Sequence, residues 1–145
     1  MRSYTDTGFL CSLYAPDAHT DKAVPAMSKR QLPLPLVWLH QIEFRNALRL
    51  QVFRKAITAT QRDASLNALL VDISDGVYEM HVPDLASVTV EAERLSASYS
   101  EKLGTRSLDI LHVAMALVLG QDEFLTFDKR QAALARAAGL SVPVL

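Results

Sequence analysis

The hydrophobic pattern is most continuous between Leu108 and Leu119, where nearly every residue is apolar and only Asp109 and His112 can ionise. A segment that is apolar on all sides predicts a buried helix, and the two polar residues, three positions apart, share one face of it. The segment is too short and too interrupted to span a bilayer. A carboxylate in the first turn of a buried helix is costly unless a cation, a metal ion or several donors meet it. The position of Asp109 therefore needs an explanation.

Other helices are predicted from apolar spacings of three and four residues and from capping residues. Asp84 is a predicted N-cap, Gly104 ends the helix that follows it, and Thr105 is predicted to cap the central helix. The predicted helices cover residues 9–14, 17–29, a long segment after residue 37, and residues 60–72, 84–103 and 129–138.

The long helix after residue 37 carries a repeat at spacings of four and three, made by Leu39, Glu43, Asn46, Leu50 and Phe53. This repeat places Glu43 and Asn46 within the apolar stripe rather than on the water-facing side. Glu43 has no basic residue four positions before or after it that could form an ion pair. A functional role therefore explains Glu43 better than a surface ion pair does.

Short apolar runs bounded by turn residues predict strands at residues 1–5, 34–37, 77–82, 123–127 and 142–145. These strands alternate with the predicted helices, and no repeat or linker interrupts the order. Such alternation is typical of an α/β fold with a mostly parallel sheet covered by helices on both faces. We expect a single domain over residues 1–145.

Composition and charge narrow the choice of function. Half of the 145 residues are hydrophobic, and the net charge is -1. This charge excludes a strongly basic nucleic-acid-binding protein, so any contact with nucleic acid needs a local basic patch. A solvated helix face explains the available patch as well as phosphate binding does; it consists of Arg45, Arg49, Arg54, Lys55 and Arg62. Cys11 is the lone cysteine and is predicted to be a small buried hydrophobe. No signal peptide is evident at the N-terminus, which predicts a cytoplasmic protein without membrane contact.

Four acidic residues are predicted to converge. Asp6 and Asp128 each follow a predicted strand directly, and the carboxyl ends of parallel strands border the functional crevice of such sheets. Glu43 and Asp109 lie near the starts of two helices on faces expected to be buried. No lysine or arginine is obviously placed among the four, so their mutual repulsion would raise some pKa values unless divalent cations neutralise the cluster. All-oxygen ligands suit Mg²⁺ and Mn²⁺.

Structural explanations compete for these residues. Asp128, with Gln131 three residues later, fits a capping box as well as it fits a catalytic site. Asp6 could cap the helix after it, and the helix dipole would favour Asp109 near a helix N-terminus. Ordinary turns explain Thr7 and Thr126 at least as well as a role in orienting carboxylates or waters. The more economical interpretation of His112 is a hydrogen-bonded core histidine.

The residues resemble the PIN domain and, within it, the bacterial VapC-type toxins of toxin–antitoxin pairs. Four motifs in the order of that family carry the resemblance: Thr5-Asp6-Thr7, Glu43-x-x-Asn46, Leu108-Asp109-x-x-His112-x-Ala114-x-Ala116-Leu117 and Leu125-Thr126-Phe127-Asp128. The resemblance implies a three-layer sandwich around a central parallel sheet of about five strands. It also implies a Mg²⁺- or Mn²⁺-dependent ribonuclease that hydrolyses RNA phosphodiester bonds.

The resemblance places the metal site and the catalytic site at Asp6, Glu43, Asp109 and Asp128. Thr7, Asn46 and Thr126 would support these carboxylates, and Arg45 or Arg49 would hold the RNA backbone. A small antitoxin whose tail blocks the acidic pocket and a homodimer are the implied partners.

Two other classes compete with a nuclease. A haloacid-dehalogenase-like phosphatase needs a second aspartate two residues after Asp6, where this chain has Gly8. A non-catalytic protein- or RNA-binding module of the same fold would keep the architecture and lose the metal. Titration with Mn²⁺ separates the module from the enzyme.

Overall fold

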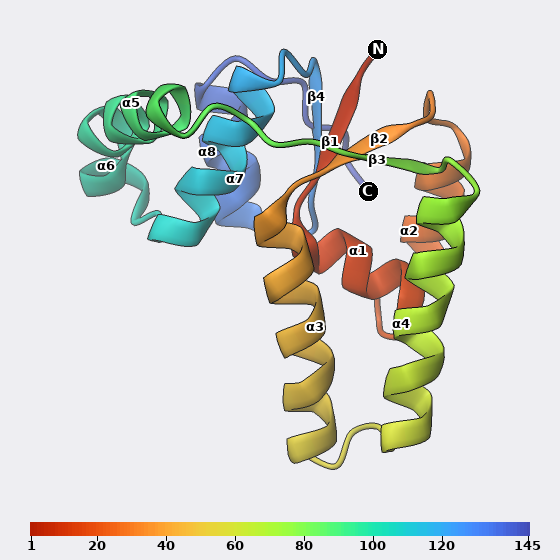
Figure 1. The fold of residues 1–145 in the computed structure, drawn as a ribbon. Coiled ribbons are helices and arrows are strands. Elements are labelled where there is room, and N and C mark those ends of the chain that lie inside the picture. Colours follow the sequence, from red (N-terminus) through yellow and green to blue (C-terminus); the bar gives the residue numbers. More distant parts are fainter. The chain divides into compact units, whose positions relative to one another are not determined.

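The computed structural model describes residues 1–145, which fold into two compact units. Unit 1 comprises residues 1–6 and 82–145, and unit 2 comprises residues 7–81. Helices dominate both units, and each unit contains one pair of short parallel strands (Figure 1).

Unit 1 is built around the pairing of β1 with β4, in which Ser3 lies opposite Glu123 and Thr5 opposite Leu125. Helix α7 packs against α5 and α8, and α8 also contacts β4. The elements of this unit are β1 (Ser3–Thr5), α5 (Leu85–Leu95), a π-helical turn η1 (Ser96–Ser100), α6 (Glu101–Leu103), α7 (Ser107–Val118), β4 (Glu123–Leu125) and α8 (Lys129–Ala137).

The core of unit 1 contains the central helix, as the apolar pattern predicts. Val113 and Ala114 of α7 are fully buried, and the rings of Tyr4 and Phe124 stack with centroids 5.5 Å apart. The Tyr4 hydroxyl lies 2.8 Å from Nδ1 of buried His112, so the interpretation of His112 as a hydrogen-bonded core histidine is confirmed. None of the helices is both long enough and apolar enough to cross a membrane.

Unit 2 contains the two long helices α3 and α4, which Figure 1 shows side by side in gold and yellow-green, joined by a short turn. Helix α1 packs against α2, α3 and α4. The core of unit 2 includes Leu10, Phe44, Leu48 and Tyr78. The elements of this unit are α1 (Thr7–Tyr14), α2 (Thr20–Ser28), β2 (Leu34–Leu36), α3 (Trp38–Phe53), α4 (Ala59–Ser74) and β3 (Tyr78–Met80), with β2 and β3 paired in parallel.

The predicted fold class is wrong. The structure has two separate two-stranded pairs, β1–β4 and β2–β3, in place of a three-layer sandwich around a central sheet of about five strands. No strand forms at residues 142–145, and the residue before them, Ser141, makes only an isolated bridge to Glu123. The sequence pattern predicts which segments form strands. It does not predict that each strand pairs with only one other strand, because strand pairing depends on contacts between residues distant in the sequence.

The predicted stripe of α3 is also wrong in phase. The buried residues are Leu39, His40, Phe44 and Leu48, whereas Asn46 is exposed and Phe53 is 82% exposed. Apolar residues lie on several sides of this helix, so their spacing alone fits more than one face.

Of two helix N-caps predicted in unit 1, one is observed and the other is not. Asp84 caps α5 by accepting a hydrogen bond from the Ser87 backbone N–H at 2.9 Å, as predicted. Thr105 does not cap α7, because its hydroxyl contacts that of Ser100 at 2.9 Å and Arg106 takes the N-cap position.

Candidate functional site

Asp6 and Thr126 follow the two strands of unit 1 directly. The Asp6 backbone N–H donates to the Leu125 carbonyl at 3.1 Å, which extends the pairing of β1 with β4 by one residue. The Thr126 hydroxyl donates to Asp6 Oδ2, and both residues are 5% exposed. Because parallel strands end at the same edge, the pairing itself brings this hydroxyl to this carboxylate.

Asp128 caps α8. Its Oδ1 accepts hydrogen bonds from the backbone N–H groups of Arg130 at 2.8 Å and Gln131 at 3.0 Å. Its own N–H donates to the Thr126 hydroxyl at 2.9 Å. The capping interpretation of Asp128 is therefore confirmed, and the capping hydrogen bonds use Oδ1 and not Oδ2.

Gln131 does not complete the predicted capping box. Its side-chain amide instead donates to the backbone carbonyl of Asp109 at 3.3 Å, and the residue is 2% exposed. This contact ties the first turn of α8 to the first turn of α7. It therefore helps to bring the two acidic residues of those turns, Asp109 and Asp128, to the same region of unit 1.

Arg106 connects Asp109 to Asp128. Its Nε donates to Asp109 Oδ2 at 3.0 Å, and its Nη2 lies 3.5 Å from Asp128 Oδ2. The Asp109 side chain is 14% exposed, whereas that of Arg106 is 68% exposed. The cation that meets Asp109 is thus an arginine of the same chain. Sequence reasoning missed Arg106, although its spacing of three residues from Asp109 is that of a helical ion pair.

Glu43 lies in unit 2, where Thr7 holds its carboxylate. The Thr7 hydroxyl donates to Glu43 Oε1 at 2.8 Å, joining the first residue of α1 to α3. Thr7 is buried and Glu43 is half-buried. This contact has the form expected of a hydroxyl that orients a carboxylate. Asn46, one turn along α3, is exposed.

The structure contains no group of three or more His, Cys, Asp or Glu side chains arranged to hold a metal ion. The chemistry of the unit 1 donors nevertheless suits a hard divalent cation, because Asp109 and Asp128 turn carboxylate oxygens toward one positive charge. Mg²⁺ is commonly held by one or two carboxylates, with waters and substrate phosphates as its remaining ligands. Asp109 and Asp128 share one cation, the Arg106 guanidinium, and no third acidic or histidine side chain completes a metal site beside them.

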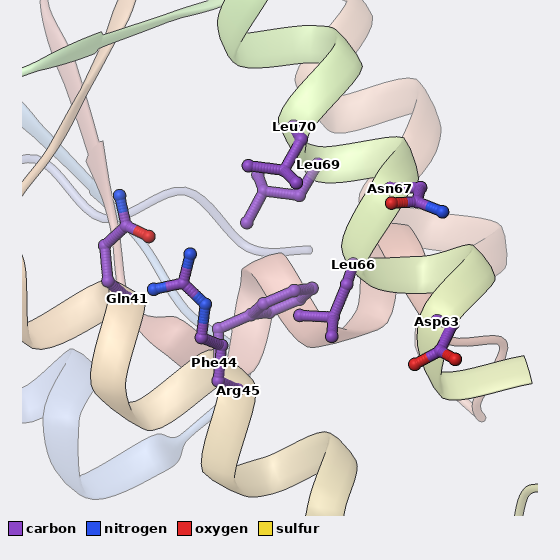
Figure 2. Close-up of a pocket in the computed structure, with 8 residues that line it drawn as sticks. All are labelled: Gln41, Phe44, Arg45, Asp63, Leu66, Asn67, Leu69 and Leu70. Carbon is purple, nitrogen blue, oxygen red and sulfur yellow. The ribbon is translucent and has the colours of Figure 1, made fainter. Parts of the chain in front are cut away.

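Unit 2 carries a pocket of about 380 Å³ between α3 and α4. Figure 2 shows the Phe44 ring of α3 pointing toward Leu66 of α4, with the Arg45 guanidinium on the side of Phe44 nearer to Gln41. The lining is completed by Gln41, Asp63, Asn67 and Leu70. Arg45 thus lies at a partly apolar recess.

Of the predicted basic patch, Arg62 is engaged by the carboxylate of its neighbour Asp63 at 3.0 Å, and Arg49 is exposed. Arg45, Arg54 and Lys55 belong to the same unit. The ion pair of Arg62 removes part of the positive charge that the sequence assigned to the patch. Arg45 and Arg49 remain the candidates for contact with an anionic backbone.

No family model and no curated protein matches the sequence. Solved structures that are similar in fold include the following two. A chain of VapBC2 from Rickettsia felis, in a crystal structure bound to a DNA fragment from their promoter, aligns with a TM-score of 0.66 and 14% identity over 99% of this chain and 98% of that one. A chain of FitAcB from Neisseria gonorrhoeae aligns with a TM-score of 0.64 and 15% identity over 97% of this chain and 95% of that one.

The identification as a PIN-domain toxin of the VapC type, drawn from four short motifs, is wrong on these findings. The likeness to chains of the VapBC2 and FitAcB complexes is one of fold at low identity, and the implied sheet of about five strands is absent. Each motif consists of a few common residues, and some of these have a local structural use. Asp128, for example, satisfies the backbone of a helix end whether or not it has any chemistry.

Proposed function

We propose that this chain is one protein of a toxin–antitoxin pair and that it is a metal-dependent endoribonuclease. The first part is supported by the fold that it shares with chains of the VapBC2 and FitAcB complexes, which are toxin–antitoxin complexes. The second part rests on the chemistry of the site in unit 1. We also propose that the chain binds a cognate antitoxin and forms a homodimer.

The observation that carries the nuclease proposal is the meeting of Asp109 and Asp128 at one cation. Asp6 joins the same network because Thr126 contacts both the Asp6 carboxylate and the Asp128 backbone. Holding like charges together is costly unless a positive charge compensates them, and here Arg106 is that charge. In the proposed enzyme a divalent cation would take over this compensation during phosphodiester hydrolysis.

Each residue has a defined part in this proposal. Asp109 Oδ2 and Asp128 Oδ2 would ligate Mg²⁺ or Mn²⁺, and Thr126 would keep Asp6 oriented at the strand ends. A bound divalent ion activates water and stabilises charge on the scissile phosphate and the leaving oxygen. In unit 2, Glu43 is a further carboxylate proposed to act in the reaction, and Thr7 orients it.

RNA is the proposed substrate. A single-stranded or looped segment is favoured over a duplex, because protein modules read splayed bases better than the deep groove of an A-form helix. Arg45 and Arg49 are proposed to hold the flanking phosphates. The recess beside Arg45 has apolar walls, formed by Phe44 and Leu66, against which a base can pack.

Cleavage of a single-stranded RNA by the purified chain tests the nuclease proposal. We expect Mn²⁺-dependent cleavage by the parent and a loss of at least about a hundredfold in Asp109→Asn, since a ligand of the ion is removed. Glu91→Gln is the matched control, because Glu91 also forms an ion pair with an arginine three residues away on a helix of unit 1. Equal cleavage by the parent and Asp109→Asn would contradict the proposal.

A non-catalytic binding module is the second candidate. The observation that favours it is that Arg106 already pairs with both Asp109 and Asp128 and compensates part of their charge. Calorimetric titration with Mn²⁺ separates the two functions. An enzyme of the proposed kind binds one or two ions per chain and loses this binding in Asp109→Asn, whereas a module of this kind shows the same heat in both proteins.

A further inference from the structure

Helix α3 carries a row of exposed and half-exposed side chains on the side opposite its buried residues. The members of this row follow one another at intervals of one helical turn, so they share one face. We name the row the outer stripe; it consists of Trp38, Ile42, Arg45, Arg49 and Phe53. Trp38 is 46% exposed, Ile42 60% and Phe53 82%. The stripe therefore presents three large apolar side chains to solvent, with two arginines between them.

The charge of the outer stripe is positive only. Residues 44–62 contain five basic residues and no acidic one. Arg45 and Arg49 form no ion pair within the chain, whereas Arg62 is held by Asp63. The nearest acidic residue of α3, Glu43, lies off the stripe and accepts a hydrogen bond from Thr7. The stripe is therefore complementary to an anionic partner.

The order of the side chains favours one kind of anionic partner. The stripe begins with the Trp38 ring, passes two guanidinium groups and ends with the Phe53 ring, over about 22 Å of helix. An acidic amphipathic helix docks through a continuous apolar ridge, which the two arginines interrupt here. Single-stranded nucleic acid carries a phosphate and a flat base at every nucleotide. It can place phosphates on the arginines and bases on the rings.

We propose that the outer stripe is a docking surface for single-stranded nucleic acid, with Arg45 and Arg49 on its phosphates and the rings of Trp38 and Phe53 as stacking platforms for its bases. The inference rests on the proposed function, which makes RNA the natural ligand. It adds two aromatic contacts to the two arginines. Such contacts tolerate any base, because every base has a π face.

Trp38 is the lone tryptophan of the chain, so intrinsic tryptophan fluorescence reports on one of the two platforms. Titration of the full chain with an oligouridylate, with EDTA present so that no cleavage takes place, should give a saturable loss of this fluorescence as a base stacks on the indole ring. Polyglutamate carries negative charge without bases. It should leave the fluorescence unchanged and should not displace the RNA at equal charge concentration.

Fluorescence anisotropy of a labelled oligouridylate measures the affinity of variants. We expect Phe53→Ala and Trp38→Ala each to lower the affinity at least about fivefold, because each loses a stacked base. Phe53→Tyr keeps a ring and should stay within about twofold of the parent. Leu85→Ala is the control, because Leu85 is a 71% exposed apolar residue on α5 of unit 1, and it should also stay within about twofold. Phe53→Ala decides alone if Trp38→Ala does not fold, since Phe53 lies outside the core.

An oligodeoxyuridylate, which differs in lacking the 2′-OH, distinguishes the two sources of a single strand. Tighter binding of the RNA strand would assign the outer stripe to RNA, and equal binding would assign it to single strands of either kind; both results support the inference. Parent affinity in Phe53→Ala together with unchanged Trp38 fluorescence would overturn it. Equal displacement by polyglutamate would also overturn it and would assign the stripe to an acidic protein.

The outcomes separate this inference from the proposed function. A chain that binds oligouridylate through the outer stripe but cleaves no RNA with Mn²⁺ would overturn the nuclease proposal alone. A chain that cleaves RNA with Mn²⁺, while Trp38 fluorescence does not respond and Phe53→Ala binds as the parent does, would overturn the docking surface alone.

Discussion

Two structural effects explain why the charged residue Asp109 is tolerated on the apolar helix α7. Its position in the first turn of α7 gives it the favourable end of the helix dipole. Its pairing with Arg106 supplies the counter-charge that its 14% exposure calls for. The two effects together make the carboxylate tolerable in the absence of metal. They leave its oxygen within reach of a stronger cation.

This pairing sets the sign of the stability change expected for Asp109→Asn. Were the acids a bare repelling cluster, removal of one charge would stabilise the protein without metal. Because Arg106 offsets the repulsion, we expect Asp109→Asn to lower the free energy of unfolding by at most about 1 kcal/mol. The rise in thermal midpoint that Mn²⁺ gives the parent should disappear, since that rise reflects binding to the native state.

Thermal unfolding with and without Mn²⁺ measures both effects of Asp109→Asn, with Glu91→Gln as the control that keeps the metal response. A metal-free variant clearly more stable than the parent would show that repulsion outweighs the pairing with Arg106. A retained Mn²⁺ response would remove Asp109 from the proposed site.

The sequence identifies Asp109 as out of place but does not identify Arg106 as its partner. A residue at a helix boundary has no fixed face, so the spacing of three residues could not tell whether Arg106 points toward Asp109 or into solvent. Its contact with Asp128 depends on the packing of α7 against α8. That packing is set by tertiary contacts and lies outside any local pattern.

At the scale of elements, two substitutions of Asp128 in the first turn of α8 distinguish its role as a helix cap from its proposed role as a metal ligand. We expect Asp128→Ala to lower the free energy of unfolding by about 0.5 to 2 kcal/mol, because two backbone N–H groups lose their acceptor. Asp128→Asn should restore most of that stability, since asparagine caps as well as aspartate. Both variants should bind Mn²⁺ more weakly if Oδ2 is a ligand.

Urea denaturation and Mn²⁺ titration of the same two Asp128 variants provide the measurements. Asp128→Asn with full stability and full Mn²⁺ affinity would reduce Asp128 to a cap. Equal stability of Asp128→Ala and the parent would contradict the capping energy instead.

A partly buried polar network joins three elements of unit 2. The Tyr14 hydroxyl of α1 donates to the Asp72 carboxylate of α4 and lies 3.1 Å from the Tyr78 hydroxyl of β3. Burial raises the pKa of Tyr14, with further contributions from the nearby Tyr78 and Asp72. Burial also raises the pKa of Tyr78 to about 12. Both phenols are therefore held protonated by the fold.

The raised pKa values predict a loss of stability in alkali. A folded-state pKa above the usual value of 10.0 means that the native state retains its proton while the unfolded chain releases it. The contribution is present in full below pH 10 and is lost as the pH rises to about 12. For Tyr78 the loss is on the order of 2 kcal/mol. Urea denaturation across this range should show a shallower decline in Tyr78→Phe, and a parallel decline would contradict it.

The elements themselves were largely predictable, because their signals are local. Asp84 and Gly104 mark the ends of the segment that contains α5 as predicted, with Gly104 at φ 65° where a left-handed residue is needed. The phase of α3 was not predictable, because apolar residues such as Ile42 and Phe53 lie on its exposed side. The spacing of apolar residues identifies the buried face of a helix only when the opposite face is polar.

At the scale of the whole molecule, pairing between distant segments limits what the sequence can specify. β1 and β4 are about 120 residues apart, and nothing local in either segment selects the other as a partner. The two-stranded arrangement was therefore missed, although four of the five predicted strands exist. The contact of Thr126 with Asp6 follows from the β1–β4 pairing and could be found only once that pairing was known.

The charge of the whole molecule also shapes how it can hold RNA. The net charge of -1 gives no general attraction for a polyanion, so binding depends on a few local cations. For single-stranded nucleic acid, each phosphate contact contributes about 0.7 to the slope of log affinity against log salt. If Arg45 and Arg49 each neutralise one phosphate, Arg45→Gln with Arg49→Gln should reduce the magnitude of that slope by about 1.4.

Fluorescence anisotropy with a labelled single-stranded RNA measures this slope, in an Asp109→Asn background that prevents cleavage. The control is Arg94→Gln with Arg136→Gln, which removes the same charge from helices of unit 1. An equal reduction of the slope in the control would mean that RNA binding depends only on the net charge of the chain. An unchanged slope in the Arg45 and Arg49 variant would assign phosphate contact to other residues, because these two arginines would then release no counterions on binding.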